Sequence, residues 1–260
     1  MRNRRPVLWQ IRISHYSEKV RWALAYKGVE HERRAPWPGA HMAVALWLTR
    51  GRHKTFPVLQ LDGKAIGDST AIIAALEERF PEPSLYPGDP SERRRALALE
   101  EWFDEELGPG IRLLGWHEAL RDRAELQEAM RSDIPRPLRG VRGAAGAATR
   151  YASAFVVLRY GVKSTEAAER ARGEVLGALD RLEAELNGND YLVGDHFTAA
   201  DLTAAALFYP LVQPADGPTP PRPTEGYERF RAPLKERPGY RWVEEMFRRH
   251  RKPAPQPVVA

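Results

Sequence analysis

The sequence predicts an α/β N-terminal domain followed by an all-α C-terminal domain, and three observations lead to that division. Strand-like and helix-like segments alternate through roughly the first eighty residues. Four prolines in PEPSLYPGDP (81–90) are typical of a linker. Beyond it, apolar residues recur with helical spacing. We therefore expect domains at 1–81 and 91–252, a linker at 82–90 and a flexible, proline-rich tail at 253–260.

The N-terminal domain is expected to begin with a strand, a helix and a second strand. PVLWQIRI (6–13) is rich in β-branched and aromatic residues, which favours a strand. The spacing of apolar residues then predicts a helix over 14–27, and Gly28 can end it with a left-handed backbone. A short strand at 29–34 and a connecting helix near 42–49 follow.

The next two strands and their helix carry the clearest local signals. Val58–Leu61 favours a strand, Asp62-Gly63 is a typical hairpin turn, and Lys64–Ile66 predicts the antiparallel return. Asp68 and Ser69 both suit a helix N-cap, and the apolar residues after them follow one face of a helix.

The C-terminal domain is expected to contain long helices at 92–107 and 165–187. Another helix begins at Thr198. The Thr198 hydroxyl can cap the amide three residues on, and Asp201 can reach back to complete a capping box.

The composition is that of a globular chain and excludes several classes of protein. Hydrophobic residues make up 43% and charged residues 29% of the 260 positions. No apolar run reaches the length of about 18 residues that a membrane-spanning helix needs. The N-terminus has no apolar stretch typical of a secretory signal. The absence of cysteine excludes disulfides, thiolate metal sites and a cysteine nucleophile.

The formal net charge of +5 is concentrated in one stretch. Residues 131–163 hold seven basic residues and one acidic residue, Asp133. We interpret this stretch as an enlarged helical insertion of the C-terminal domain, and the favoured hypothesis is a solvated, flexible connector. A site for an anionic ligand or a membrane surface is the second hypothesis. Nucleic acid comes last and is not expected as a partner, because no recognisable reading motif accompanies the charge.

The order of elements and three stretches resemble the glutathione transferase superfamily. SHYSEKVRWALAYKG (14–28) resembles its first helix and entry loop, and TFPVLQLDGKAIGDSTAI (55–72) its cis-proline strand, hairpin and helix. YLVGDHFTAADL (191–202) resembles its C-terminal capping box. The resemblance spans most of residues 6–250, and points to serine-type, cytosolic bacterial members. It implies a thioredoxin-like N-terminal domain, an all-helical C-terminal domain, and a cytoplasmic homodimer.

A binding site for a thiol tripeptide is predicted near the third strand. A cis bond at Pro57 would turn the Phe56 backbone outward, where its amide and carbonyl can pair with an extended peptide. The helix N-terminus at Asp68 and Ser69 favours a carboxylate, and Asp68 can also hold an α-amino group. Glutathione carries both charges. A plain double N-cap is the alternative. Lys54 can meet the other carboxylate of the ligand or remain a solvated loop residue.

Ser14 stands where the chain enters its first helix. A free thiol has a pKa of about 8.5, and a hydroxyl donor at a helix N-terminus favours the thiolate. The resemblance implies that Ser14 has the place of the activating serine. His15 departs from the proline most often found after that serine. Ser17, His15 and Tyr16 are therefore alternative candidates, and simple helix capping is the alternative role for Ser14.

The pocket for an electrophile is expected between the first-helix loop and the C-terminal helices. Aromatic residues at helical spacing can line such a pocket or belong to the core. The candidates are Trp102, Phe103, Trp116, His117, Tyr151 and Phe155.

We therefore expect a glutathione S-transferase-like enzyme that joins glutathione, or a related low-molecular-weight thiol, to a small hydrophobic electrophile. Glutathione is expected as a co-substrate, with no tightly bound cofactor and no metal. The absence of cysteine argues against the branch of the family that uses its own thiol. The alternative is a non-catalytic protein of the same fold that binds a hydrophobic or anionic ligand.

Overall fold

The computed structural model describes residues 5–36, 39–131, 141, 143–218 and 222–252. The expected tail at 253–260 and residues 132–140 and 142 of the basic stretch lie outside these residues.

The N-terminal domain contains a four-stranded sheet with the strand order β2-β1-β3-β4. Its strands are β1 (Val7–Trp9), β2 (Glu32–Arg34), β3 (Val58–Leu61) and β4 (Lys64–Gly67). β1 pairs parallel with β2 and antiparallel with β3, and β4 returns antiparallel along β3. Its helices are α1 (His15–Tyr26), α2 (His41–Leu48) and α3 (Ser69–Arg79).

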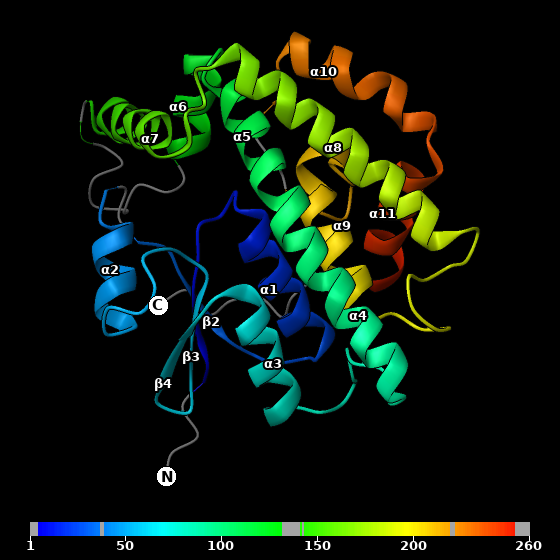
Figure 1. Cartoon of the computed structure of the whole chain (residues 1–260). Helices are drawn as coiled ribbons and strands as arrows, with labels where there is room; N and C mark the ends of the chain where they lie inside the picture. Colours follow the sequence, from blue (N-terminus) through cyan, green and yellow to red (C-terminus); the bar gives the residue numbers. More distant parts are fainter. Residues whose placement is uncertain (1–4, 37–38, 132–140, 142, 219–221, 253–260) are drawn as a thin grey trace.

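The two faces of this sheet are covered by different helices (Figure 1). Leu8 and Leu59 belong to the large core cluster that also contains the buried residues of α1 and α3. Val58 and the neighbouring Trp9 belong to a smaller cluster with Ala45 of α2. Adjacent residues of a strand point to opposite faces, which accounts for this division.

The first strand is shorter than the sequence predicts. The expected strand over 6–13 ends at Trp9, because residues beyond it leave the sheet. A turn closed by the Ser14 amide on the Ile11 carbonyl, at 3.1 Å, leads the chain into α1. The apolar residues of this stretch therefore line a loop.

The C-terminal domain is helical, as expected from its periodicity. Its α-helices are α4 (Pro90–Trp102), α5 (Gly108–Ala119), α6 (Arg123–Arg131), α7 (Ala144–Tyr160), α8 (Thr165–Leu186), α9 (Ala199–Val212), α10 (Glu225–Arg231) and α11 (Pro238–His250). The predicted helix at 92–107 does not stop at Leu107: a π-helical segment, η1 (Phe103–Leu107), joins α4 to α5. A 3₁₀ turn, η3 (Ala232–Glu236), follows α10. Among the described residues, no helix is long and apolar enough to cross a bilayer.

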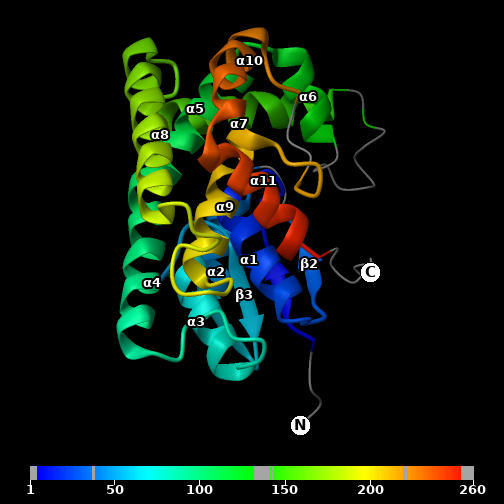
Figure 2. The same cartoon turned by 90° about the vertical axis from the view of Figure 1, so that its right-hand side faces the viewer.

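Helix α9 lies at the centre of the molecule, between the N-terminal domain and the outer helices (Figure 2). The predicted capping box starts it: Asp201 accepts from the Thr198 amide at 2.8 Å and from the Thr198 hydroxyl at 2.7 Å. Asp201 also accepts from the Leu192 amide at 2.8 Å. Helix α9 also packs against α1 of the N-terminal domain, so the two domains share one core.

Helix α7 shows how part of the basic stretch is arranged. Residues 144–160 form a helix that packs against α6, and most of its residues are partly or fully exposed. The Tyr151 hydroxyl donates to the Gly39 carbonyl at 3.2 Å, and the Phe155 ring meets His41 edge-on at 4.6 Å. Helix α7 therefore spans from the C-terminal domain to the start of α2 (Figure 1).

Candidate functional site

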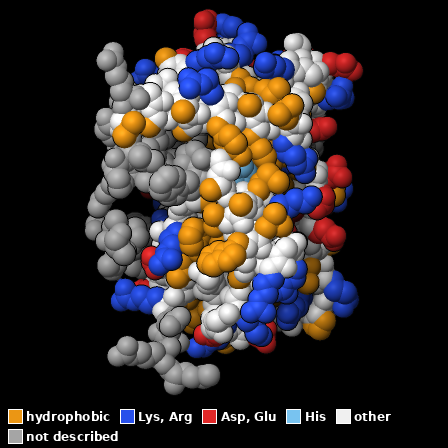
Figure 3. All heavy atoms as spheres, turned by 90° about the vertical axis from the view of Figure 1, so that its left-hand side faces the viewer, with side chains coloured by type: hydrophobic (Ala, Val, Ile, Leu, Met, Phe, Trp, Pro, Cys, Tyr) orange, Lys and Arg blue, Asp and Glu red, His pale blue; other side chains and the backbone are white. Residues whose placement is uncertain are grey.

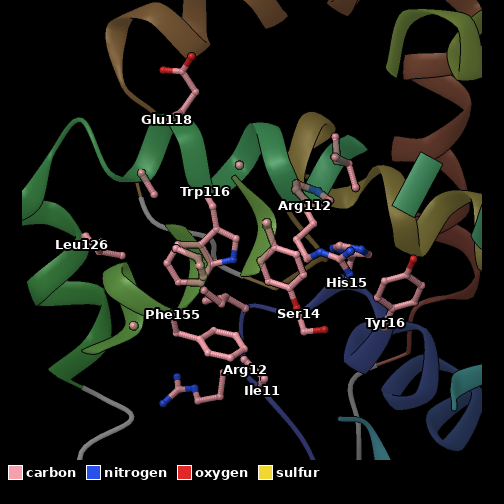
Figure 4. Close-up of a pocket in the computed structure, with 18 of the residues that line it drawn as sticks. Ile11, Arg12, Ser14, His15, Tyr16, Arg112, Trp116, Glu118, Leu126 and Phe155 are labelled. Carbon is pink, nitrogen blue, oxygen red and sulfur yellow. The ribbon is translucent and has the colours of Figure 1, made fainter. Parts of the chain in front are cut away.

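A cavity of about 260 Å³ lies between the two domains. The N-terminal domain contributes residues 10–16, the start of α2, and Thr55 with Phe56. The C-terminal domain contributes side chains from α5, α7 and α9 and from the segment 222–227. Figure 4 shows Ser14 at the centre of this arrangement, between the side chains of α5 and those of α7.

Ser14 is the N-cap of α1 and lines the cavity. Its Oγ accepts from the Ser17 amide at 3.3 Å. The loop that carries it is held from both sides: the Tyr209 hydroxyl donates to the Ile13 carbonyl at 2.7 Å, and Arg21 donates to the Arg12 carbonyl at 3.1 Å. The loop therefore holds a hydroxyl at the positive end of a helix, in the wall of the cavity.

The three alternatives to Ser14 occupy different places. His15 lines the cavity and is almost fully buried, and burial followed by the charge of Arg112 lowers its pKa to about 3, so its ring is neutral at pH 7. Tyr16 also lines the cavity, but its hydroxyl donates to the Asp104 carbonyl at 2.8 Å, and burial raises its pKa. Ser17 is fully buried, does not line the cavity, and accepts from the Ile11 amide at 3.3 Å.

The residues predicted to hold the tripeptide lie along one edge of the N-terminal domain. The Phe56–Pro57 peptide bond is cis, and Phe56 lines the cavity. Asp68 caps α3 by accepting from the Thr70 and Ala71 amides, both at 3.0 Å, and Ser69 is the buried first residue of that helix. Pro57, Asp68 and Ser69 do not line the cavity.

Two further features bear on these residues. Asp68 has φ +73°, a backbone conformation that non-glycine residues seldom adopt and that is frequent at functional sites. Lys54 is exposed and also lies outside the cavity lining.

Behind Asp68, a buried charge network connects the domains, and sequence reasoning missed it. The Lys19 ammonium contacts Thr70 Oγ1 at 2.9 Å, Glu100 Oε1 at 2.9 Å and Asp104 Oδ2 at 2.5 Å. Thr70 in turn donates to Asp104 at 2.7 Å. The only signal for it in the sequence is a lysine within the apolar face of the first helix. The network fixes the start of α3 against η1.

The aromatic candidates divide into two groups. Trp116, Tyr151 and Phe155 line the cavity, and the Tyr151 and Phe155 rings stack at 6.5 Å. Trp102 does not line it and packs edge-on against the buried Phe103 at 5.1 Å, so the assignment of Trp102 to the pocket is wrong.

Two more of the expected lining residues lie elsewhere. Phe103 belongs to the core, and His117 turns from the cavity to contact the Val162 carbonyl at 2.7 Å. Helical spacing predicted that these side chains are buried. It did not predict which side of each helix faces the cavity.

Several lining residues of the C-terminal domain were not predicted, and three of them are polar. Arg112 and Glu118 extend from α5 and Tyr160 from α7. Glu118 accepts from Arg172 at 2.8 Å and from the Thr224 hydroxyl at 2.7 Å, and so anchors the segment 222–227 beside the cavity. Charged residues on a helix are ordinarily solvent-exposed. The positions of Arg112 and Glu118 in the sequence therefore did not indicate that they line a cavity.

The part of the chain that the structure describes contains no group of three or more His, Cys, Asp or Glu residues arranged to hold a metal ion.

Comparisons with known proteins agree with this architecture. Residues 8–84 match the family model of the glutathione S-transferase N-terminal domain, and residues 146–249 match that of the C-terminal domain. A probable maleylacetoacetate isomerase of Caenorhabditis elegans is 29% identical over 209 residues, which is 80% of each protein. Protein LigF of Sphingobium sp. strain SYK-6 is 28% identical over 166 residues, covering 61% of this chain and 60% of that protein.

Solved structures share the fold. The crystal structure of beta-etherase LigF from the same Sphingobium strain aligns with a TM-score of 0.60 at 24% identity, over 93% of this chain and 99% of that one. Glutathione transferase GSTFuA3 from Phanerochaete chrysosporium aligns with a TM-score of 0.63 at 21% identity, over 97% and 99% of the two chains.

Proposed function

Because the chain belongs to the glutathione transferase superfamily, we propose that it is a glutathione-dependent enzyme that forms a bond between the thiol sulfur and a small electrophile. One observation carries the proposal: Ser14 Oγ, at the N-terminus of α1, lines the same cavity as the aromatic side chains of Trp116 and Phe155. A hydroxyl for the thiolate and an apolar site for its reaction partner are thus adjacent.

Ser14 supplies the activation in this proposal. A hydroxyl that donates to sulfur stabilises the thiolate over the thiol, and the helix N-terminus adds to the effect. Each unit by which the thiol pKa falls below about 8.5 corresponds to about 1.4 kcal/mol. The neutral His15 beside it contributes no charge at pH 7, so the hydroxyl and the helix dipole are the stabilising groups that the loop of Ser14 supplies.

The tripeptide lies along the edge formed by Phe56, Asp68 and Ser69. The Phe56 backbone aligns it, and the γ-glutamyl end occupies the N-terminus of α3. Asp68 uses Oδ1 for both capping bonds, which leaves Oδ2 for the α-amino group. Lys54 is the candidate for the glycyl carboxylate. Glutathione acts as a co-substrate, and the enzyme is a cytoplasmic homodimer.

Two outcomes of the first step are compatible with the relatives. Addition of the thiolate to an unsaturated carbon, followed by proton uptake, gives a conjugate. The same addition, followed by bond rotation and loss of the thiolate, gives an isomer. The relative named as a probable maleylacetoacetate isomerase aligns with 80% of this chain. Isomerisation is therefore the alternative reaction to conjugation.

Retention on immobilised glutathione tests the binding assignment. The protein should be retained, and the double variant Asp68→Ala, Ser69→Ala should be released. Retention of the double variant would contradict the proposed site. A panel of other low-molecular-weight thiols as eluents identifies the preferred one.

The ultraviolet absorbance of the bound thiolate, followed against pH, tests the role of Ser14. The bound thiol should titrate below its free pKa of about 8.5, and Ser14→Ala should raise the midpoint by about one to two units. Ser17→Ala is the matched control, because Ser17 lies one turn further along the helix and outside the cavity. An unchanged titration in Ser14→Ala would assign Ser14 to capping alone and favour the non-catalytic alternative.

A further inference from the structure

Arg112 is a cation in the cavity wall, and no counter-ion for it lies among the residues that the structure describes. Among the described residues, it donates no hydrogen bond and forms no ion pair, and its Nε is buried without an acceptor. Its guanidinium lies over the Tyr160 ring at 4.4 Å and faces the Tyr16 ring at 6.0 Å. Burying a charge without a partner is unfavourable, and stacking on rings offsets only part of that cost.

Arg112 is partly buried, and several more deeply buried charged residues have partners. Arg21 contacts Glu18 at 2.5 Å and Gln10 at 2.8 Å. Glu118, which also lines the cavity, is already engaged by Arg172 and Thr224. His15, next to Arg112, is neutral at pH 7 because its pKa is lowered by burial and then by Arg112 itself. Nothing in the described cavity wall neutralises the Arg112 guanidinium.

The position of Arg112 relates it to the aromatic site. Trp116 follows four residues later on α5, about 6 Å along the helix axis, and both side chains face the cavity. Figure 4 shows Arg112 extending toward His15 and Ser14 while Trp116 extends toward Phe155. The cavity therefore offers a cationic site and an aromatic site on the same helix.

We propose that Arg112 binds a carboxylate of the electrophilic substrate, so that the enzyme selects aromatic or unsaturated acids over their neutral analogues. This inference rests on the proposed function, in which the cavity receives the electrophile. A planar guanidinium suits a carboxylate because it can donate two parallel hydrogen bonds. The ring of the substrate then lies between Trp116 and Phe155.

The surroundings of the cavity favour anions as well. The chain has no acidic residue between Glu32 and Asp62 or between Asp133 and Glu166, and the described parts of these two intervals hold eight basic residues. They include α2 and α7, which both flank the cavity. On the face where these helices lie, Figure 3 shows hydrophobic and basic side chains together. A field of one sign around a cleft raises the local concentration of oppositely charged substrates.

Calorimetric binding of 3-nitrobenzoate and 3-nitrobenzamide, without any thiol, tests the inference directly. The wild-type protein should bind the acid more tightly than the amide. Arg112→Gln should weaken binding of the acid about ten- to a hundredfold, the range expected for a lost charged hydrogen bond, and change binding of the amide less than about threefold. Unchanged amide binding also reports that the variant is folded.

Two further variants sharpen the result. Arg112→Lys should keep part of the preference, since it retains the charge but loses the planar pair of donors. Arg93→Gln is the matched control: Arg93 lies over the Tyr86 ring at 5.0 Å, outside the cavity, and its loss should leave both affinities unchanged.

Three results would overturn the inference. The first is a wild-type protein that does not prefer the acid, or binds neither compound. The second is an equal loss of both affinities in Arg112→Gln. The third is reduced retention of Arg112→Gln on immobilised glutathione with unchanged acid binding, which would assign Arg112 to the tripeptide. Because the calorimetric titration contains no thiol, it tests the anion site independently of the proposed thiol chemistry.

Discussion

Two tyrosines of the C-terminal domain donate to backbone carbonyls of the N-terminal domain at opposite ends of the cavity. Tyr209 of α9 is buried and contacts the Ile13 carbonyl at 2.7 Å. Tyr151 of α7 is 41% exposed and contacts the Gly39 carbonyl at 3.2 Å. We call these the inner end, next to Ser14, and the outer end, next to α2.

The two ends differ in how firmly the surrounding contacts hold them. The inner end is part of the common core of α1 and α9, so the loop that carries Ser14 is fixed by interactions that water does not weaken. The outer end is held by surface contacts of α7, which are individually weak. We therefore expect chemistry to depend on the inner end and substrate size to depend on the outer end.

The pH dependence of stability should show the largest effect at the inner end. His15 has an unfolded pKa near 6.5 and a folded pKa lowered to about 3, chiefly by burial. The folded state therefore binds fewer protons in this range, so stability is complete above about pH 6.5 and falls as the pH falls toward 3, by up to about 1.4 kcal/mol per pH unit.

His15→Gln should remove that contribution. Urea unfolding between pH 7 and 4 should give a flatter profile for His15→Gln than for the wild type, although His31, whose pKa is lowered to about 4, retains a contribution of the same sign. His196→Gln, at an exposed histidine, is the control. Parallel profiles for wild type and His15→Gln would mean that the His15 ring is accessible to water.

A smaller loss of stability is expected where α5 meets α1. A Cβ at Gly108 would lie 1.9 Å from the Tyr16 hydroxyl, which donates to the Asp104 carbonyl. Gly108→Ala should therefore destabilise the protein by about 1–3 kcal/mol, the usual range for overpacking.

Gly115→Ala provides a matched control on the same helix, because nothing lies within 4 Å of its Cβ position. It should be neutral or stabilise by up to about 1 kcal/mol, since alanine favours helix over glycine. Thermal unfolding of both variants makes the comparison. Equal unfolding temperatures of the two variants would show that the Tyr16 side chain moves aside at little cost and that the inner end is not rigid.

The smallest effects should come from the two tyrosine hydroxyls themselves. Tyr209→Phe leaves the buried Ile13 carbonyl without its donor and should cost about 1–2 kcal/mol. Tyr151→Phe exposes the Gly39 carbonyl to water and should change stability by less than about 0.5 kcal/mol. Chemical unfolding of each variant measures both values. A loss in Tyr151→Phe as large as that in Tyr209→Phe would remove the distinction between the ends.

Parts of the fold set by neighbouring residues were predictable from the sequence. The hairpin over 58–67, the start of α3 at Asp68 and the capping box at Asp201 each depend on side chains within a few positions of one another. The boundaries of α8 follow from its apolar stripe and its Ser164 cap.

Features that depend on contacts between residues far apart in the sequence were not predictable from it. The early end of β1 reflects a loop held by Arg21 and Tyr209, and neither residue is close in sequence to Trp9. Trp102 and Trp116 have similar helical surroundings, yet only Trp116 reaches the cavity. Arg112 was missed because an arginine on a helix gives no local sign of the rings against which it packs.

The π-helical segment η1 has a consequence for the lineage of this chain. A π turn accommodates one residue more than an α turn, so residues after Leu107 are rotated by about 100° relative to an uninterrupted helix. That phase shift is what brings Arg112 and Trp116 to the cavity side of α5. A homologue with one residue fewer between Phe103 and Leu107 and an uninterrupted α-helix would therefore direct its counterparts of these two side chains to the same side. The π turn absorbs the extra residue locally, so the length of this short segment can change in a lineage while the cavity wall keeps its phase.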